Sequence, residues 1–184
     1  DAGKVSNLTR MEKKSPTGKR NGPYEHFDRV EIRQSNPKDA LELVGKRLEL
    51  IRDIAPKSKR VAILANPLHP GEKAERKASL SAAEPLGLEL LYTEFDAAQG
   101  FEAALDKVRK QRCDGMVVFP DAGMLARAAQ IAEFALKERL LCVSGWAEFA
   151  QAGCIASYGP NLSEGYRRLA HYADRILKGA HPAS

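Results

Sequence analysis

The sequence lacks the short glycine-rich motifs that identify several large classes of enzyme. No Gly-x-Gly-x-x-Gly follows its first predicted strand, and neither Gly-x-x-x-x-Gly-Lys-Ser/Thr nor Gly-x-Ser-x-Gly occurs. These motifs hold dinucleotides, nucleotide phosphates and hydrolase nucleophiles respectively, so all three functions lose their main sequence support. No run of about 18 apolar residues is present either, so we expect no membrane-spanning helix.

Cysteine and histidine are few and scattered. The three cysteines are an odd number, lie far apart and stand in or beside apolar stretches, which favours buried thiols over a disulfide framework or a zinc site. The four histidines are also dispersed. We therefore expect no metal site and no cofactor. The residues concerned are Cys113, Cys142 and Cys154, with His26, His69, His171 and His181.

Charge of one sign does not dominate any folded part of the chain. The 184 residues include 29 basic and 24 acidic side chains spread throughout, which is typical of a mixed surface and not of a nucleic-acid-binding stripe. Only the opening stretch is clearly basic, with Gly, Ser, Pro and Asn between the charges. We expect residues 1–38 to form a loosely ordered segment, irregular at 14–23.

From Asp39 onward, short apolar runs alternate with amphipathic stretches. Five strands are predicted, at 61–65, 88–93, 115–119, 140–144 and 154–157. Six helices are predicted, at 41–54, 71–83, 98–111, 124–138, 147–151 and 162–178. The last of these has Asn161 as its expected cap and stops before Gly179.

Strands that alternate with helices in this way predict repeated βαβ units. Their right-handed crossovers produce a parallel sheet with helices on both faces. We therefore expect a doubly wound α/β domain with five strands in the order 2-1-3-4-5. Its expected extent is 39–160, followed by a C-terminal helix and tail at 161–184.

Polar and aromatic residues follow the predicted strands where each one ends. In open parallel sheets a ligand lies outside the carboxyl ends of the strands, at the point where strand order reverses, here between the first and third predicted strands. We expect a small-molecule site at this edge. Its candidate residues are Asn66, Pro67, Asp121, Ala122, Gly145, Trp146, Ser157 and Tyr158.

Structural roles are also compatible with these residues. Asn66 could close an Asx turn before its proline, and Asp121 could cap the following helix. Trp146 could pack over the sheet edge instead of contacting a ligand. Tyr158, with Gly159 and Pro160, could belong to a turn.

Five stretches of the chain resemble the C-terminal lobe of ABC-transporter substrate-binding proteins of the periplasmic-binding type I class, which includes tryptophan- and phenylalanine-binding members. The resemblance covers about residues 43–183. Its most specific parts are Ala-Asn-Pro after the first predicted strand and Ser-Tyr-Gly-Pro after the last. The stretches are GKRLELIRDIAPKSKRVAILANP, DGMVVFPDA, LCVSGWAEFAQAG, IASYGPN and GYRRLAHYADRILKGAHPA.

The resemblance implies a periplasmic or otherwise extracytoplasmic protein of two lobes that close on a small solute, such as an amino acid. Such a protein delivers the solute to a membrane permease by hinge closure, without catalysis. Ligand contacts are then expected near the strand-end residues above.

The front of the chain departs from the family, whose members carry a whole N-terminal α/β lobe where this sequence has only its basic segment. The final helix returns to that lobe in the family, so here its apolar side is expected to be exposed or buried in a homodimer. The apolar residues are Tyr166, Leu169, Tyr172, Ile176 and Leu177.

Two other classes of function are compatible with this fold. A flavodoxin-like or phospho-receiver domain shares the strand order, and Asp121 and Ser144 stand where a receiver keeps its phospho-acceptor and small hydroxyl residue. Receivers also need an acidic pair after the first strand, where this chain has Asn66-Pro67. A small hydrolase would need a base beside Ser144 or Cys142, and no histidine signature is near them. The sequence favours a binding lobe.

Overall fold

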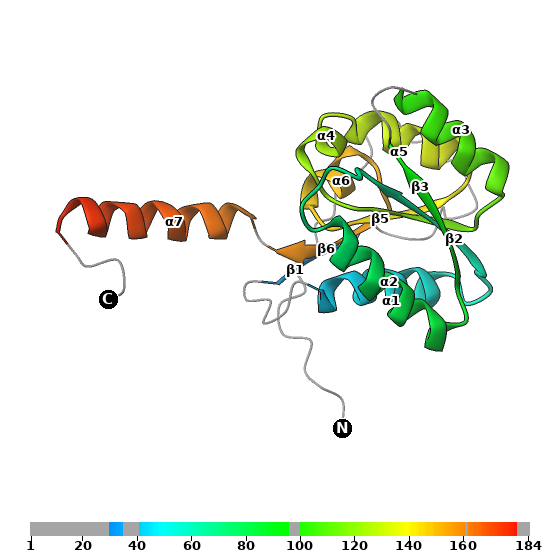
Figure 1. Ribbon diagram of the computed structural model, residues 1–184, viewed down its shortest axis with the longest axis horizontal. Coiled ribbons are helices and arrows are strands. Elements are labelled where there is room, and N and C mark those ends of the chain that lie inside the picture. The colour runs from blue at the N-terminus through cyan, green and yellow to red at the C-terminus, as the bar shows by residue number, and fades with distance from the viewer. Residues whose placement is uncertain (1–29, 35–40, 96–99, 161, 180–184) are drawn as a thin grey trace.

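The computed structural model describes residues 30–34, 41–95, 100–160 and 162–179, and its centre is a parallel β-sheet (Figure 1). Six strands in the described part pair in the order β1-β6-β5-β4-β2-β3. Their bounds are β1 Val30–Gln34, β2 Arg60–Ala65, β3 Glu89–Glu94, β4 Gly115–Val118, β5 Leu141–Ser144 and β6 Ala156–Pro160. The helices are α1 Glu42–Ile54, α2 Glu72–Leu86, α3 Phe101–Gln111, α4 Ala122–Leu125, α5 Ala128–Lys137, α6 Ala147–Ala152 and α7 Leu162–Leu177.

The predicted strand order is confirmed. The five predicted strands are β2 to β6, and they lie in the order β3-β2-β4-β5-β6, which is 2-1-3-4-5 in the numbering of the prediction. Val61 of β2 lies between Leu90 of β3 and Gly115 of β4, both in parallel register. Strand order therefore reverses between β2 and β4, as the doubly wound fold requires.

Two hydrophobic layers cover the sheet, one on each face. Val61 and Ile63 of β2 face Leu48 of α1, while Ala62 and Leu64 face the layer formed with α3, α5 and α6. Figure 1 shows α1 and α2 below the sheet, with α3 and α5 above it. Because both faces are covered, the apolar run of β2 shows no polar alternation.

The helix predicted at 124–138 is interrupted at Arg127, so the prediction of one continuous helix is wrong. Arg127 has φ −112° and ψ 12°, and it separates α4 from α5. Its Nη1 donates to the carbonyl of Gly123 (3.0 Å), and its guanidinium lies 5.1 Å and 5.3 Å from the ring centres of Phe95 and Phe101. These contacts stabilise the Arg127 side chain in a position that it would not occupy in a continuous helix.

Strand β1 was not predicted, and it changes the edge of the sheet. Val30–Gln34 pairs in parallel with β6, from Val30 opposite Ala156 to Gln34 opposite Pro160. The expectation of loose order is therefore wrong for these five residues, whereas the irregular stretch expected at 14–23 lies outside the described residues. Pairing with β1 also extends β6 to Pro160, beyond its predicted end at 157.

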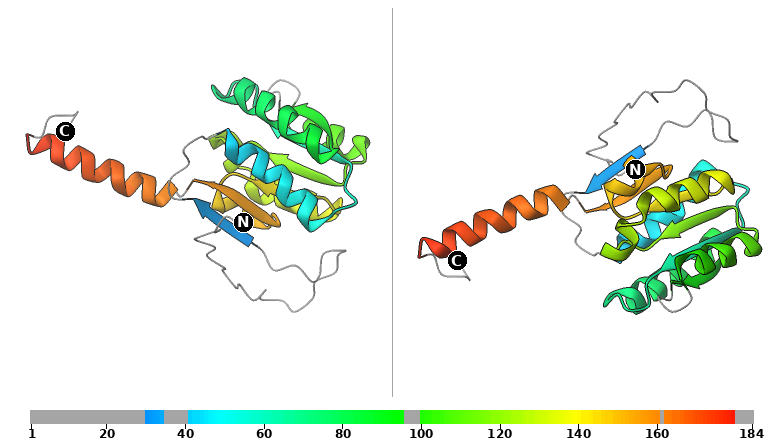
Figure 2. Two further views of the ribbon diagram at one scale, coloured as in Figure 1. Left: turned by 90° about the horizontal axis from the view of Figure 1, so that it is seen from below. Right: turned by 90° about the horizontal axis from the view of Figure 1, so that it is seen from above.

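Helix α7 projects away from the sheet (Figures 1 and 2). Every α7 residue whose side chain the structure describes is exposed. These include the apolar residues Tyr166, Leu169, Tyr172, Ile176 and Leu177. The expected exposed apolar side is therefore present. Within the described residues, no helix is both long and apolar enough to cross a membrane.

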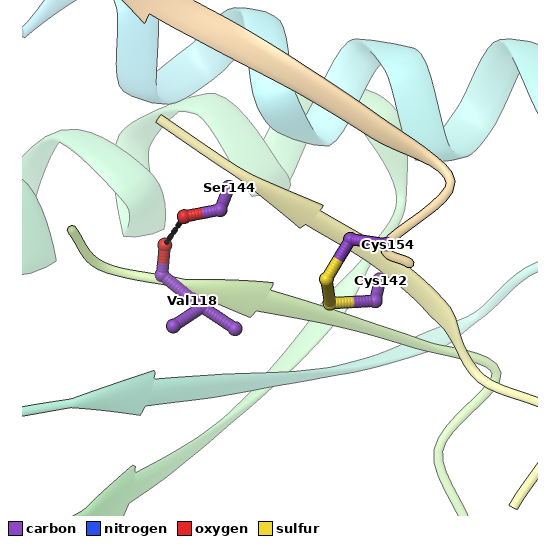
Figure 3. Close-up of a disulfide and its surroundings, with 4 residues drawn as sticks. All are labelled: Val118, Cys142, Ser144 and Cys154. Atoms are coloured by element: carbon purple, nitrogen blue, oxygen red, sulfur yellow. Dashed lines mark hydrogen bonds between the residues drawn. A yellow bond between two sulfur atoms is a disulfide. The ribbon is translucent and has the colours of Figure 1, made fainter. Parts of the chain in front are cut away.

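A disulfide joins Cys142 of β5 to Cys154, just before β6 (Figure 3). The expectation of buried free thiols is wrong for this pair. After α6 the chain returns beside β5, where Ile155 N donates to the Cys142 carbonyl (2.9 Å). This turn brings the two Cα atoms to 4.8 Å, although 12 positions separate them in sequence. Cys113 is half-buried and free, and burial raises the pKa of its thiol to about 11.

Removing the disulfide should destabilise the domain. A crosslink that closes a loop of this length restricts the unfolded chain, so Cys142→Ala/Cys154→Ala should lower the free energy of unfolding by about 2–3 kcal/mol in urea titrations. Cys113→Ala is the matched control and should retain the response to reductant. Thiol titration of the denatured wild type should give one thiol without reductant and three with it. Three thiols without reductant would contradict the pairing.

Candidate ligand-binding site

The structure brings all eight predicted site residues to one edge of the sheet. They follow strands β2, β4 and β5 or lie within β6, and these four strands are consecutive in the sheet. Asn66 and Pro67 follow β2, Asp121 and Ala122 lie just beyond β4, and Gly145 and Trp146 follow β5. Ser157 pairs with Ser144 at the end of β5, which places Ser157 and Tyr158 at the same level within β6. The sequence pattern thus identified one continuous edge.

Asn66 shapes the turn after β2. Its Oδ1 accepts a hydrogen bond from Leu68 N (3.0 Å), so the expected Asx turn is present. The side chain is half-buried, whereas Pro67 is exposed and borders a shallow depression along the outer side of α2. Asn66 therefore has a structural role at the rim of the edge.

Only one of the two carboxylate oxygens of Asp121 takes part in capping the following helix. Oδ1 accepts from Gly123 N (2.6 Å) and Met124 N (3.1 Å), which confirms the helix-capping role at α4. The side chain is 7% exposed, and its Oδ2 is buried with no hydrogen-bond partner in the described part of the chain. An ionised oxygen in this position can accept a hydrogen bond from a ligand.

Arg47 of α1 reaches the same edge and was not predicted. The residue is 2% exposed, and its Nε donates to the Tyr158 carbonyl (3.0 Å). Burial lowers the pKa of Arg47 to about 10, and the nearby Glu75 carboxylate partly offsets this. The guanidinium therefore remains charged near neutral pH. Its Nη1 is buried without a hydrogen-bond partner among the described residues.

Glu75 of α2 connects the charges at this edge. Burial raises the pKa of the Glu75 carboxyl, the charges of Arg47 and His69 lower it, and Glu72 and Asp121 raise it further. The side chain is half-buried, and Oε2 is shielded from water with no hydrogen-bond partner in the described residues. Arg47, Glu75 and Asp121 thus form one electrostatic group, which we call the edge cluster.

Two glycines allow the ends of β5 and β6 to approach closely. A Cβ at Gly159 would overlap the carbonyl oxygen of Gly145. A Cβ at Gly145 would lie 2.5 Å from Arg47 Nη2 and 2.8 Å from Pro120 Cγ. Both positions therefore require glycine for space, and the guanidinium of Arg47 fills the room beside Gly145.

The remaining predicted residues have mainly structural surroundings. Trp146 is half-buried against the hydrophobic layer of α3, α5 and α6, so the packing alternative is confirmed. Ser157 is buried. Tyr158 is half-buried and lies within β6, so its assignment to a turn is wrong.

The candidate nucleophiles are engaged elsewhere. Ser144 is fully buried, and its hydroxyl donates to the Val118 carbonyl (2.9 Å), as Figure 3 shows. Cys142 is part of the disulfide. Neither side chain offers the free nucleophile that the hydrolase alternative needs. Across the described ranges, no three His, Cys, Asp or Glu side chains converge to hold a metal ion, which the receiver alternative would require.

Comparison with models of known protein families shows which family the chain belongs to. A family model described as ABC transporter substrate binding protein matches residues 38–184. The chain belongs to this family. The family is described as substrate-binding proteins of ABC transporters, and it is typically extracytoplasmic. A search of curated proteins finds no match.

Solved structures share the fold of this chain. A conserved domain protein from Vibrio cholerae matches with TM-score 0.68 and 18% identity, over 83% of this chain and 49% of that one. An ABC domain in complex with L-Trp from Streptococcus pneumonia matches with TM-score 0.68 and 16% identity, over 76% and 48%. A ligand-free, open substrate-binding protein from Clostridium difficile matches with TM-score 0.57 and 20% identity, over 74% and 46%. The chain spans about half the length of each.

Arg47 and Glu75 were missed because their neighbours suggest ordinary surface helices. The available signal was the position of Arg47, three residues after Val44 and four before Ile51, on the apolar side of α1. A charged residue on such a side is either paired or functional.

The glycine at 159 gives a direct test of the strand-end geometry. Gly159→Ala should lower the free energy of unfolding by about 1–3 kcal/mol, because the added methyl group overlaps the backbone of β5. Gly165→Ala on α7 is the control, since nothing lies within 4 Å of its Cβ position. Urea unfolding followed by circular dichroism measures both. Equal stability of Gly159→Ala and wild type would show that β5 and β6 are farther apart.

Proposed function

We propose that this chain is the ligand-binding lobe of the solute-binding component of an ABC-type uptake transporter, and that it binds a small amino-acid-like solute at the carboxyl edge of its sheet. The observation that carries the proposal is the buried, unpartnered Oδ2 of Asp121 beside the point of strand reversal. Family membership and the L-Trp complex of one structural neighbour support it.

In this proposal Asp121 anchors the ammonium group of the solute. A carboxylate oxygen that is already shielded from water forms a strong charge-assisted bond with an ammonium donor. The proposal takes the rest of the site from residues along the same edge of the sheet, which are Asn66, Pro67, Ala122, Gly145, Trp146, Ser157 and Tyr158.

Transport in this proposal consists of binding and release. Residues 39–160 form the binding lobe, and 161–184 form a crossover segment toward a second lobe that closes over the solute. The closed form is then recognised by the membrane permease. No bond of the solute is broken, so the edge needs no catalytic group.

The disulfide supports an extracytoplasmic location. Disulfides persist in oxidising compartments such as the periplasm and are rare in the reducing cytosol. Cys142 and Cys154 are joined within the core of the lobe, where β5 and β6 begin. A periplasmic or cell-surface location therefore suits both the disulfide and the proposed transport role.

Native mass spectrometry tests the proposed function. The purified chain should bind a small molecule that is added at millimolar concentration, and L-Trp is the first compound to add. A single lobe lacks the contacts that close over the solute, so the affinity should be weak, about millimolar. If no compound of a metabolite library binds at millimolar concentration, the proposal fails.

Replacing Asp121 separates capping from binding. Asp121→Asn keeps the Oδ1 acceptor for Gly123 N and Met124 N but removes the charge, so folding should be retained while affinity for the identified solute falls about tenfold or more. Asp121→Ala should also destabilise α4. Calorimetry on folded Asp121→Asn decides the role, since unchanged affinity would leave Asp121 as a helix cap only.

We also propose that the chain forms a homodimer through α7 when no second lobe covers this helix. The exposed apolar residues Tyr166, Leu169, Tyr172 and Ile176 recur at intervals of three or four, so they form one stripe along the helix. A second copy offers the same stripe, and a two-fold pairing would bury both.

Sedimentation tests the dimer. Wild type should show a concentration-dependent dimer, and Leu169→Asp/Ile176→Asp should be monomeric at all concentrations. Leu136→Asp is the control, because Leu136 is 71% exposed on α5, away from α7. A wild type that stays monomeric at high concentration would exclude this dimer.

A further inference from the structure

Unsatisfied polar atoms gather in the edge cluster. Among the described residues, five buried side-chain atoms have no hydrogen-bond partner, and three of them belong to this cluster. They are Arg47 Nη1, Glu75 Oε2 and Asp121 Oδ2. A buried polar atom without a partner destabilises a fold, and more so when it is charged. Such atoms are rare in proteins, so their concentration at one edge calls for a functional explanation.

The three groups lie close together in the fold. Helices α1 and α2, which carry Arg47 and Glu75, pack against each other, and the pKa of the Glu75 carboxyl is lowered by the charge of Arg47 and raised by that of Asp121. The Arg47 guanidinium and the Pro120 ring both flank Gly145, and Pro120 directly precedes Asp121. Groups contributed by α1, α2 and the end of β4 are therefore neighbours at this edge of the sheet.

The charges in the cluster have both signs. The cluster contains the guanidinium of Arg47 and the carboxylates of Glu75 and Asp121. Each of the three has one buried atom without a hydrogen-bond partner among the described residues. The Arg47 Nε donates to the Tyr158 carbonyl, and Asp121 Oδ1 accepts from Gly123 N in the helix cap. These hydrogen bonds fix the orientation of both groups. Oriented ions that are shielded from water bind a complementary ion strongly.

We propose that Arg47 and Glu75 act with Asp121 as the recognition site for a zwitterionic solute, with the solute carboxylate on Arg47 and its ammonium between Asp121 and Glu75. This inference rests on the proposed function and deepens it, because it names the charge pattern of the solute. The inference requires the half-buried Glu75 side chain to move aside for the entering molecule, because Arg47 and Asp121 are only 2% and 7% exposed.

The proposed pairing makes a prediction about solute analogues. An amine without a carboxylate leaves Arg47 Nη1 unpaired, and an acid without an ammonium leaves two carboxylates unpaired. The standard amino acids should be screened against the wild-type chain. Each one that binds is then compared with its decarboxylated amine and with the matching acid that lacks the amino group.

Wild-type protein labelled with ¹⁵N gives a local readout. The Arg47 Nε–H donates to Tyr158, so its signal should shift when the solute carboxylate reaches the guanidinium, along with the Gly123 and Met124 amide signals beside Asp121. An amino acid should bind at least tenfold more tightly than either analogue. Equal binding of the amine, or an Arg47 signal that stays still at saturation, overturns the inference.

Variants provide a second measurement. Arg47→Met and Glu75→Gln should each weaken amino-acid binding at least tenfold. Arg47→Met should weaken binding of the matched amine little. Arg52→Met is the control on α1, because Arg52 binds the Pro56 and Ser58 carbonyls, near the amino end of β2. If Arg47→Met does not fold, the analogue comparison on wild type decides the question.

The outcomes separate this inference from the proposed function. If native mass spectrometry identifies a bound solute that is not zwitterionic, the inference and the amino-acid-like solute are overturned, whereas the role as a solute-binding lobe stands. If a zwitterion binds but Arg47→Met binds it as tightly as wild type does, the assigned residues are wrong and the proposed function again stands. If no small molecule binds at all, both are overturned.

Discussion

The close approach of β5 and β6 at Gly145 and Gly159 determines the geometry of the functional edge. Because Gly159 has no Cβ, the two strand ends can come together, and the missing Cβ at Gly145 leaves space for a guanidinium. Arg47 fills this space and donates to the Tyr158 carbonyl, which ties α1 to β6. The position of the charge is thus a consequence of backbone packing. A larger residue at either glycine would move both the strand ends and Arg47.

The order of the central strands could be predicted because it depends on local patterns. Each apolar run of four to six residues alternates with an amphipathic helix, and such an alternation permits few topologies. The location of the candidate site followed from this order, and Asp121 was found both as a cap and as a candidate ligand residue. Asn66 was likewise placed correctly in an Asx turn.

The features that were missed depend on contacts between distant parts of the chain. The position of the Arg47 side chain depends on its hydrogen bond to the Tyr158 carbonyl. The pairing of Cys142 with Cys154 depends on how α6 returns the chain to β5. The break at Arg127 depends on aromatic rings from other segments. Periodicity in a single sequence contains no information about such partners. The sequence signal that could have been used was Arg47, a charged residue on the apolar side of a predicted helix.

The pairing of β1 with β6 has a consequence for the order of assembly. Val30 lies opposite Ala156, so the first described strand completes its hydrogen bonds only with the last one. During synthesis β1 is made early, but it cannot pair until nearly the whole lobe, including β6, has been made. Until then the backbone groups of β1 are free to bond with other chains, and β6 remains an open edge without it. Completion of this edge is therefore a late, long-range step, the kind that slows folding and exposes newly made chains to aggregation.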